Sequence, residues 1–188
     1  MKNILIGLIV LLTTLSCKAQ VIAVEDFENH NQDLEDGAYI KDINNVLDKY
    51  VGTWTGTYSS KNYEFTIIKF TENNTNGSLN YKVDLLLMKY KITDSTGTEL
   101  VNTLGFSNDN MFVIRGDYVT SNDTYVLSYQ GLDTECGQNG TIYISISNAA
   151  SDVMKLGFLV DGEMGLDCTA GGTIQILPTT SGLELTKQ

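Results

Sequence analysis

Residues able to perform nucleophilic chemistry are scarce in this sequence. Its 188 residues include one histidine, His30, and three cysteines, Cys17, Cys136 and Cys168. The motifs G-x-S-x-G, H-E-x-x-H and G-x-G-x-x-G and the phosphate-binding P-loop are all missing. A Ser–His or Cys–His pair is therefore not expected, because the single histidine falls in an acidic segment near the N-terminus.

Carboxylates are the remaining residues that could support catalysis, as in glycoside hydrolysis, where two of them act together. Glu64 with Glu72 or Asp84 is the kind of pair that the sequence offers. Carboxylates on strands mostly form the solvent-facing side, however. We therefore predict a protein with no enzymatic activity, no catalytic residue and no cofactor.

Cys136 and Cys168 are compatible with a disulfide formed in an oxidising compartment. Such a bond would stabilise the fold by ~3 to 4 kcal/mol in the chain-entropy model. Two free thiols or a shared metal ion are the alternatives. The absence of C-x-x-C spacing and the remoteness of His30 argue against zinc, so no metal site is predicted.

The N-terminus has the pattern of a secretory signal peptide. Lys2 precedes an apolar stretch from Ile4 to Leu12, which is too short to span a bilayer. The next residues, Thr13-Thr14-Leu15-Ser16-Cys17, resemble the lipobox of bacterial lipoproteins. This resemblance implies that residues 1–16 are removed and that Cys17 carries a lipid anchor in the outer membrane of the cell envelope. The alternative is an ordinary signal peptide cleaved near Ala19.

An acidic tether is predicted over residues 17–37, between the anchor and the folded domain. The tether carries carboxylates at positions 25, 26, 28, 33, 35 and 36 and no Arg or Lys after Lys18. Such a segment repels itself and stays extended. The whole chain has a formal net charge of −11, which disfavours both nucleic acid and anionic lipid surfaces as partners. No later stretch is long and apolar enough for a transmembrane helix.

The folded domain is predicted to span residues 38–188 as a single unit. It opens with a short helix, since Ile43, Val46, Leu47 and Tyr50 recur at i, i+3, i+4 and i+7. From Thr53 onward, apolar residues alternate with polar ones or form short runs between turn residues, which indicates strands. The predicted strands cover 53–59, 62–71, 78–92, 98–105, 110–119, 123–131, 140–148, 152–160, 171–177 and 182–187. Eight to ten such strands favour an all-β fold, an antiparallel up-and-down β-barrel, with a two-sheet β-sandwich as the alternative.

One short motif resembles a known family of barrels. Tyr50-Val51-Gly52-Thr53-Trp54 is similar to the aromatic-x-Gly-x-Trp signature that opens the first strand of calycins, the lipocalins and fatty-acid-binding proteins. The resemblance implies a calycin-like barrel in which Trp54 packs at the closed end and a small apolar ligand occupies the interior. In that family an arginine from a late strand covers the tryptophan. The only arginine here, Arg115, falls in a middle strand.

The wall of a ligand-holding barrel would come from apolar and aromatic residues of the predicted strands. The ligand-binding candidates are Trp54, Tyr81, Leu87, Phe112, Tyr125 and Tyr129, with Leu85, Ile114 and Leu127 beside them. An interior of about eight strands is only just wide enough for one ligand. The same side chains could instead fill it as ordinary core.

A wider resemblance links this chain to an uncharacterised family of lipid-anchored Gram-negative proteins. It covers Gly37 to Asn45, Gly52 to Tyr58 and the start Ser16-Cys17-Lys18-Ala19-Gln20. The resemblance implies export and the domain boundaries given above. It brings no activity, ligand or catalytic residue.

Two non-catalytic functions follow from these observations. The first is binding of a small apolar or amphipathic ligand inside the barrel of a membrane-anchored lipoprotein. The alternative is a surface interaction module, or accessory subunit, that binds a protein or a glycan. For the alternative, Tyr125, Tyr129 and Tyr143 could form an aromatic patch, since tyrosine combines a large rigid area with a polar tip.

Overall fold

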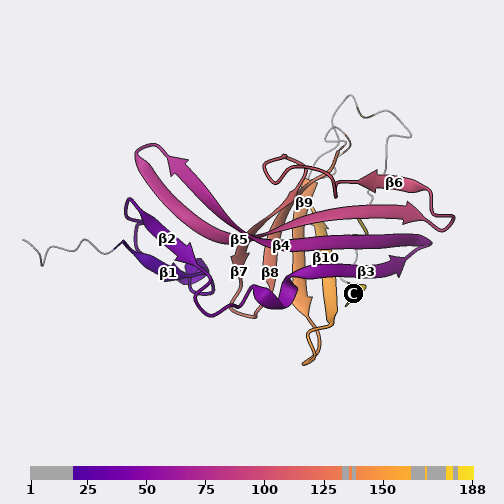
Figure 1. Cartoon of the computed structure of the whole chain (residues 1–188), viewed down its shortest axis with the longest axis horizontal. Coiled ribbons are helices and arrows are strands. Elements are labelled where there is room, and N and C mark those ends of the chain that lie inside the picture. Colours follow the sequence, from indigo (N-terminus) through magenta and orange to yellow (C-terminus); the bar gives the residue numbers. More distant parts are fainter. Residues whose placement is uncertain (1–18, 133–135, 137–138, 162–167, 169–176, 180–181) are drawn as a thin grey trace, which may run out of the picture.

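Eleven β-strands and two single-turn 3-10 helices form the described part of the chain (Figure 1). The computed structural model describes residues 19–132, 136, 139–161, 168, 177–179 and 182–188. The strands are β1 (Val21–Ala23), β2 (Ala38–Lys41), β3 (Gly52–Tyr58), β4 (Lys61–Asn76), β5 (Leu79–Asp94), β6 (Glu99–Asn102), β7 (Ile114–Val119), β8 (Tyr125–Gln130), β9 (Asn139–Ile146), β10 (Val153–Val160) and β11 (Leu183–Lys187). The 3-10 helices are η1 (Phe27–Asn29) and η2 (Asp48–Tyr50).

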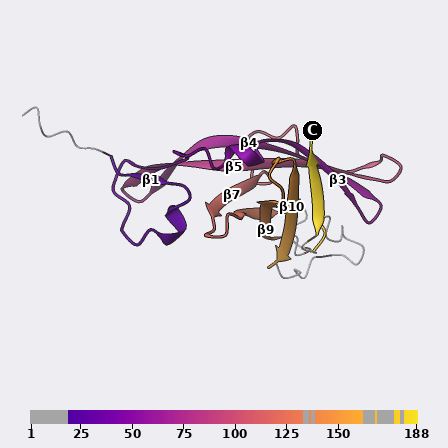
Figure 2. The same ribbon diagram turned by 90° about the horizontal axis from the view of Figure 1, so that it is seen from below.

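An up-and-down barrel is formed by β3, β4, β5, β7, β8, β9, β10 and β11. Each of these strands pairs antiparallel with the next one in the barrel, and β11 returns to pair with β3. Figure 2 shows the long β4–β5 hairpin along one side, with β7, β9 and β10 across from it. The predicted all-β barrel is confirmed. The strand predicted at 171–177 lies outside the described residues except for Leu177.

Alternation along the strands explains which side chains fill the barrel. In β9, Ile142 and Ile144 are buried while Tyr143 between them is exposed. In β8, Tyr125, Leu127 and Tyr129 point inward in the same way. Successive side chains of a strand face opposite sides of the sheet, so one face of each strand becomes core. The inward residues of these strands belong to a single hydrophobic cluster.

A chain of aromatic rings crosses this core. Phe65 packs on Tyr90 with ring centroids 6.2 Å apart, and Tyr90 packs on Tyr129 at 6.1 Å. Tyr129 in turn meets the edge of Phe158 at 5.1 Å. Ring pairs of this kind contribute about 0.5–1.5 kcal/mol each beyond the burial of apolar area. The rings join β4, β5, β8 and β10 through the middle of the barrel.

Trp54 packs at one end of the barrel, as the resemblance to calycins implies. Its side chain is fully buried, and its Nε1 donates a hydrogen bond to the carbonyl oxygen of Tyr50 at 2.7 Å. Gly52 has φ +135°, a conformation that side chains rarely adopt. The Nζ atom of Lys187, in the last strand, lies 5.3 Å from the ring centre of Trp54. A lysine therefore supplies the cation that the family takes from arginine.

The helix predicted over residues 43–50 is wrong. Only the single turn η2 forms, and Ile43 is 51% exposed instead of joining Leu47 and Tyr50 in the core. The reason is local, because Asn45 adopts φ +56°, which is incompatible with a right-handed helix. The carboxylate of Asp42 holds the resulting loop by accepting hydrogen bonds from the backbone N–H groups of Val46 and Leu47.

The prediction of a solvated tether is also wrong for the described part of residues 17–37. Strand β1 pairs in parallel with β2, and β2 pairs in parallel with β5, so this segment extends the sheet (Figure 1). Ile22 and Val24 are buried. The acidic side chains avoid mutual repulsion because several accept backbone hydrogen bonds, as Glu28 does from Ser121 N and Asp36 from Asn80 N.

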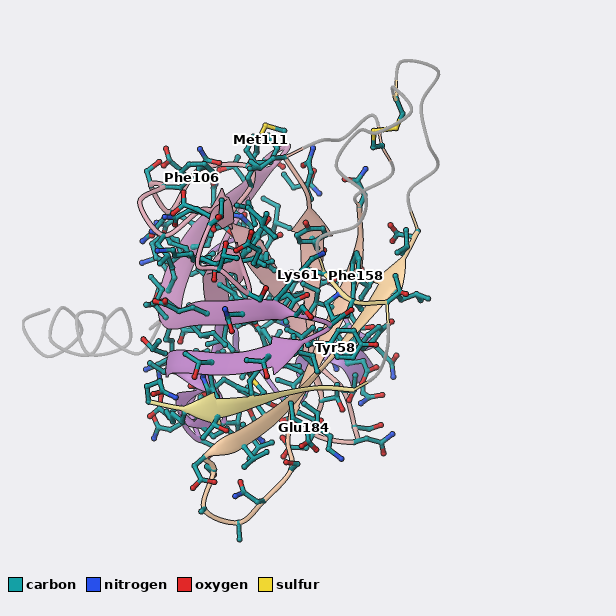
Figure 3. The ribbon with its side chains drawn as sticks, turned by 90° about the vertical axis from the view of Figure 1, so that its right-hand side faces the viewer. Tyr58, Lys61, Phe106, Met111, Phe158 and Glu184 are labelled. Atoms are coloured by element: carbon teal, nitrogen blue, oxygen red, sulfur yellow. A yellow bond between two sulfur atoms is a disulfide. The ribbon has the colours of Figure 1, made fainter. Side chains whose placement is uncertain are left out.

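A disulfide joins Cys136 to Cys168, as predicted (Figure 3). The bond joins the segment between β8 and β9 to the segment between β10 and β11. The two cysteines are separated by 32 residues in the sequence. The flanking residues 133–135, 137–138, 162–167 and 169–176 are outside the described part of the chain. The bond links two connections at the end of the barrel opposite Trp54.

Replacing Trp54 by alanine is expected to reduce the free energy of unfolding by about 3–5 kcal/mol, because it leaves a large cavity at the closed end. The measurement is chemical denaturation followed by circular dichroism. Tyr143→Ala, on the outer face, is the control and should change stability by about 0.5 kcal/mol or less. A loss below about 1 kcal/mol for Trp54→Ala would contradict the role of this residue as the end plug.

When the denatured protein is alkylated without reductant, Cys136 and Cys168 are expected to stay unlabelled, so neither residue should add mass. After reduction, Cys136 and Cys168 should both be labelled. The double variant Cys136→Ser/Cys168→Ser should lose about 3–4 kcal/mol of stability, since the unfolded chain regains the entropy of an open loop. Labelling at either cysteine before reduction would show that the pair is not formed.

Candidate functional site

Three of the six ligand-binding candidates lie inside the barrel. Trp54, Tyr125 and Tyr129 are buried in the central cluster. A Cβ atom added to Gly116 would lie 2.1 Å from the Tyr125 hydroxyl, so this glycine makes room for the ring. The same hydroxyl accepts a hydrogen bond from Leu86 N at 3.0 Å. These side chains pack against one another, and burial raises the pKa of both tyrosines.

The other three candidates lie elsewhere. Leu87 is on the outer face of β5, in a second cluster with Leu85 and Val113, against which the half-buried Phe106 packs. Tyr81 lies opposite Ala38 of β2, beyond the part of β5 that pairs with β7. Phe112 lies in the β6–β7 connection. Sequence could not place them because a strand with apolar residues on both faces carries no signal of which face is inside.

The tyrosine patch considered for a partner does not form. Tyr125 and Tyr129 point into the barrel, whereas Tyr143 lies on the outer face of β9. The residues opposite Tyr143 are Val126 on β8 and Gly157 on β10. Tyr143 is therefore separated from the other two by the thickness of the sheet.

The candidate carboxylates do not converge on one point. Glu64 and Glu72 lie eight positions apart along β4, roughly 26 Å at the usual rise per residue. Glu72 forms an ion pair with Arg115, with Oε1 and Nη1 2.5 Å apart. Asp84 lies on the opposite face of the hairpin from Glu64 and Glu72. It is two and four residues before Leu86 and Met88, which point into the barrel, and alternate residues of a strand share a face.

Asp84 belongs to a polar network that joins β2 and the loop before η2 to the β4–β5 hairpin. Its carboxylate accepts hydrogen bonds from Tyr39 Oη at 2.8 Å, Thr71 Oγ1 at 2.6 Å and Asp42 N at 3.0 Å. Burial alone would raise the pKa of Asp84, but these hydrogen bonds and the nearby Lys69 together lower it below its usual range. Lys69 also pairs with Asp42 and Asp48. The network is fully engaged, so it holds structure and offers no free group.

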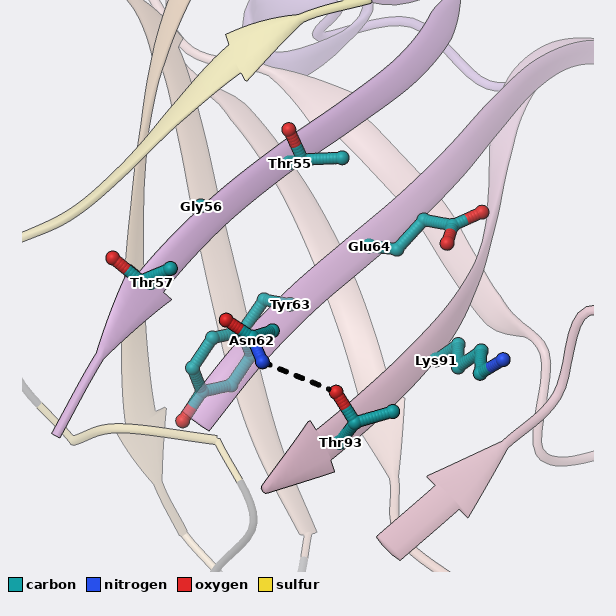
Figure 4. Close-up of a pocket in the computed structure, with 8 residues that line it drawn as sticks. All are labelled: Thr55, Gly56, Thr57, Asn62, Tyr63, Glu64, Lys91 and Thr93. Atoms are coloured by element: carbon teal, nitrogen blue, oxygen red, sulfur yellow. Dashed lines mark hydrogen bonds between the residues drawn. The ribbon is translucent and has the colours of Figure 1, made fainter. Parts of the chain in front are cut away.

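A polar cleft of about 450 Å³ lies on the outer face of β3, β4 and β5 (Figure 4). It is lined by Thr55, Gly56, Thr57, Asn62, Tyr63, Glu64, Lys91 and Thr93. The strand register lines up Thr55, Glu64 and Lys91 in one row across the three strands. Side chains that face one another in this way lie on the same side of the sheet.

The cleft contains both fixed and free polar groups. Asn62 Nδ2 is fixed by hydrogen bonds to Thr93 Oγ1 at 3.3 Å and to the carbonyl oxygen of Asp94 at 3.1 Å. Lys91 has one distant ion pair, 3.8 Å from Glu99 Oε2. Within the described residues, no hydrogen bond or ion pair engages the carboxylate of Glu64. The half-buried Glu64 is therefore an acceptor that a ligand could use.

A smaller groove of about 220 Å³ lies between β4 and the β6–β7 connection, lined in part by Phe70, Glu72, Asn108 and Arg115. The guanidinium of Arg115 is occupied by Glu72 and by the carbonyl oxygen of Asn108, 3.0 Å from Nη2. The other carboxylate of the groove, Asp109, accepts a hydrogen bond from Ser107 and lies near Arg115.

A further opening of about 440 Å³ is lined in part by Met111, Arg115, Ser128, Tyr129 and Asn139. We take the cleft on β3, β4 and β5 as the candidate site because it contains the unengaged carboxylate of Glu64.

Comparison with known proteins gives a family and no function. Residues 1–156 match the family described as "Family of unknown function (DUF6705)". The chain belongs to this family. No curated protein and no solved structure matches the chain. The DUF6705 assignment agrees with the expectation of an uncharacterised family, and the cleft of this DUF6705 member must be interpreted from its own geometry.

Two further features bear on the site. In the part of the DUF6705 chain that the structure describes, no group of three or more His, Cys, Asp or Glu residues is arranged to hold a metal ion. The helices described here are too short to cross a membrane. Lys91 and Glu64 are the charged residues that line the cleft.

Replacing Asp84 by asparagine is expected to flatten the acid branch of the stability curve. The lowered pKa of Asp84 means that its contribution is complete above about pH 4, the usual aspartate value, and is lost as pH falls through the lower folded pKa. Urea denaturation at a series of acidic pH values measures this. Asp161→Asn, an exposed aspartate after β10, is the control, and equal slopes for Asp84→Asn and wild type would contradict the argument.

Proposed function

We propose that this chain is an exported lipoprotein, anchored in the outer membrane through Cys17, whose barrel binds a neutral carbohydrate on its outer surface without catalysis. The observation that carries the proposal is the half-buried Glu64 in the cleft on β3, β4 and β5, whose carboxylate forms no hydrogen bond or ion pair within the described residues. Beside it, Thr55 Oγ1 accepts a hydrogen bond from Gln188 Nε2 at 2.7 Å, and Lys91 lies 3.8 Å from Glu99. The lipobox-like residues before Cys17 support the anchor. This is the interaction-module alternative, with a glycan as the partner.

The packed interior favours an outer site. Tyr90 and Tyr129 have their hydroxyl oxygens 3.4 Å apart in the middle of the core, and both side chains are buried. An apolar ligand inside would have to displace such rings, at a cost of about 0.5–1.5 kcal/mol for each aromatic pair that it separates. A ligand could occupy the cleft on the outer face without displacing any core side chain.

The chemistry of the cleft suits hydroxyl groups. A sugar hydroxyl both donates and accepts, so it can donate to the Glu64 carboxylate and accept from the Lys91 ammonium or from a threonine. Lys91 faces Glu64 and also lies 3.8 Å from Glu99, so the cleft has no excess positive charge that would select an acidic ligand. The net charge of −11 adds repulsion against acidic polysaccharides. A neutral oligosaccharide fits these conditions best.

The soluble chain, residues 19–188, should bind some member of a panel of neutral oligosaccharides, with NMR shifts confined to the cleft residues. Glu64→Gln keeps the shape and removes the charge of the acceptor, and we expect affinity to fall about tenfold, as for loss of a charged hydrogen bond of ~1.5 kcal/mol. Glu184→Gln, on the exposed outer face of β11, is the matched control and should bind like wild type.

Two outcomes would contradict the proposal. One is binding that Glu64→Gln and Glu184→Gln leave equally unchanged. The other is a small apolar molecule that copurifies with the protein and appears in native mass spectra but not in denatured ones. The second outcome would favour the interior ligand predicted from the resemblance to calycins.

A further inference from the structure

The proposed anchor lies very close to the folded part of the chain. Only three residues, Lys18, Ala19 and Gln20, separate Cys17 from the first residue of β1, Val21. Four steps of extended chain span at most ~14 Å. Gln20 is already held, because its carbonyl oxygen accepts a hydrogen bond from Tyr39 N at 2.8 Å and its side chain accepts one from Glu35 N. A lipid on Cys17 would therefore hold β1 within this distance of the bilayer surface.

We propose that the sheet formed by β1, β2 and the adjoining part of β5 lies against the lipid headgroups, and that the occupant of this face is an anionic bilayer surface. The inference rests on the proposed anchoring at Cys17 and adds an orientation to it. It follows from the short connection and from the charges on one face of this sheet.

The exposed face of this small sheet carries lysines. The register places Val21 of β1 opposite Tyr39 of β2, and Tyr39 opposite Lys82 of β5. Lys41, two residues after Tyr39, lies on the same side, with its Nζ 5.8 Å from the Tyr39 ring centre. Val21 is 53% exposed, and both lysines are exposed. No carboxylate of the described residues forms an ion pair with Lys41 or Lys82.

The carboxylate that shares this face is already engaged. Asp84, two residues after Lys82, accepts three hydrogen bonds and lies beside Lys69. The face therefore presents two free positive charges and one exposed valine, although the chain as a whole is acidic. Each lysine near an anionic lipid surface contributes about 1 kcal/mol. The two lysines attract anionic headgroups locally, although the segment between β1 and β2 carries carboxylates at positions 25, 26, 28, 33, 35 and 36.

The orientation places the candidate cleft away from the membrane. In Figure 1, β1 and β2 lie beside one end of the β4–β5 hairpin, and the ends of β3 and β6 lie at the other. Asn74 and Asn62 mark the two ends along β4, about 40 Å apart at the usual rise per residue. A cleft at Asn62 would be open to a glycan beyond the bilayer surface.

Lysine acetylation read by mass spectrometry tests this orientation. The lipidated chain is reconstituted into vesicles of phosphatidylcholine with phosphatidylglycerol and compared with the soluble chain of residues 19–188, which contains every described element. Lys41 and Lys82 are expected to react several-fold more slowly on vesicles. Lys155, exposed on the outer face of β10, is the internal control and should react equally in both samples.

The two possible failures are distinguishable. Unchanged reactivity of Lys41 and Lys82, on a chain whose N-terminal mass shows an acylated Cys17, would overturn the orientation and leave the anchor in place. A mature N-terminus without acyl mass would overturn the anchor and the orientation together. A second variant, Lys41→Gln/Lys82→Gln, should lose the added affinity for phosphatidylglycerol vesicles, whereas Lys155→Gln should not.

Discussion

Packing across the barrel interior is the constraint on which the rest of the structure depends. The seam between β5 and β7 has two registered pairs, Leu87 with Arg115 and Met88 with Ile114, and the seam between β3 and β11 also has two. Such short seams supply few hydrogen bonds, so the rings that cross the interior must hold the wall together. A barrel closed in this way keeps its centre filled, and openings of the described residues lie on the outer face of β3, β4 and β5 and beside Tyr129 of β8.

The β4–β5 hairpin contributes to two parts of the structure because its strands, 16 residues each, are longer than the other strands of the barrel. Near Phe65 and Tyr90 it forms the wall, and near Asp84 it becomes a platform for β1, β2 and the loop before η2. Asp84 and Asp42 join these parts through buried hydrogen bonds and the Lys69 ion pair. The same length separates β1 and β2, at one end of the hairpin, from the cleft near the other end.

The resemblance to calycins accounts for the closed end but not for the interior. Gly52 and Trp54 occupy the positions that the motif implies, and Lys187 stands where the family has arginine, because a long cationic side chain from the last strand can reach the ring. Arg115 instead pairs with Glu72 on the outer face. A shared end plug therefore coexists with an interior that is packed by tyrosine and phenylalanine.

The sequence by itself predicted the strands of the barrel from β3 onward and their glycine–tryptophan start, because alternation and turn residues are local properties. It offered a Cys136–Cys168 disulfide beside two alternatives, and it did not predict β1 or β2. Tertiary structure alone decided three other features. Leu87 is buried on the outer face of β5 because the β6–β7 connection covers that face. Ile22 is buried because the three-residue strand β1 pairs with β2. The row from Thr55 to Lys91 exists only because separate strands meet in one register, which no single segment of sequence encodes.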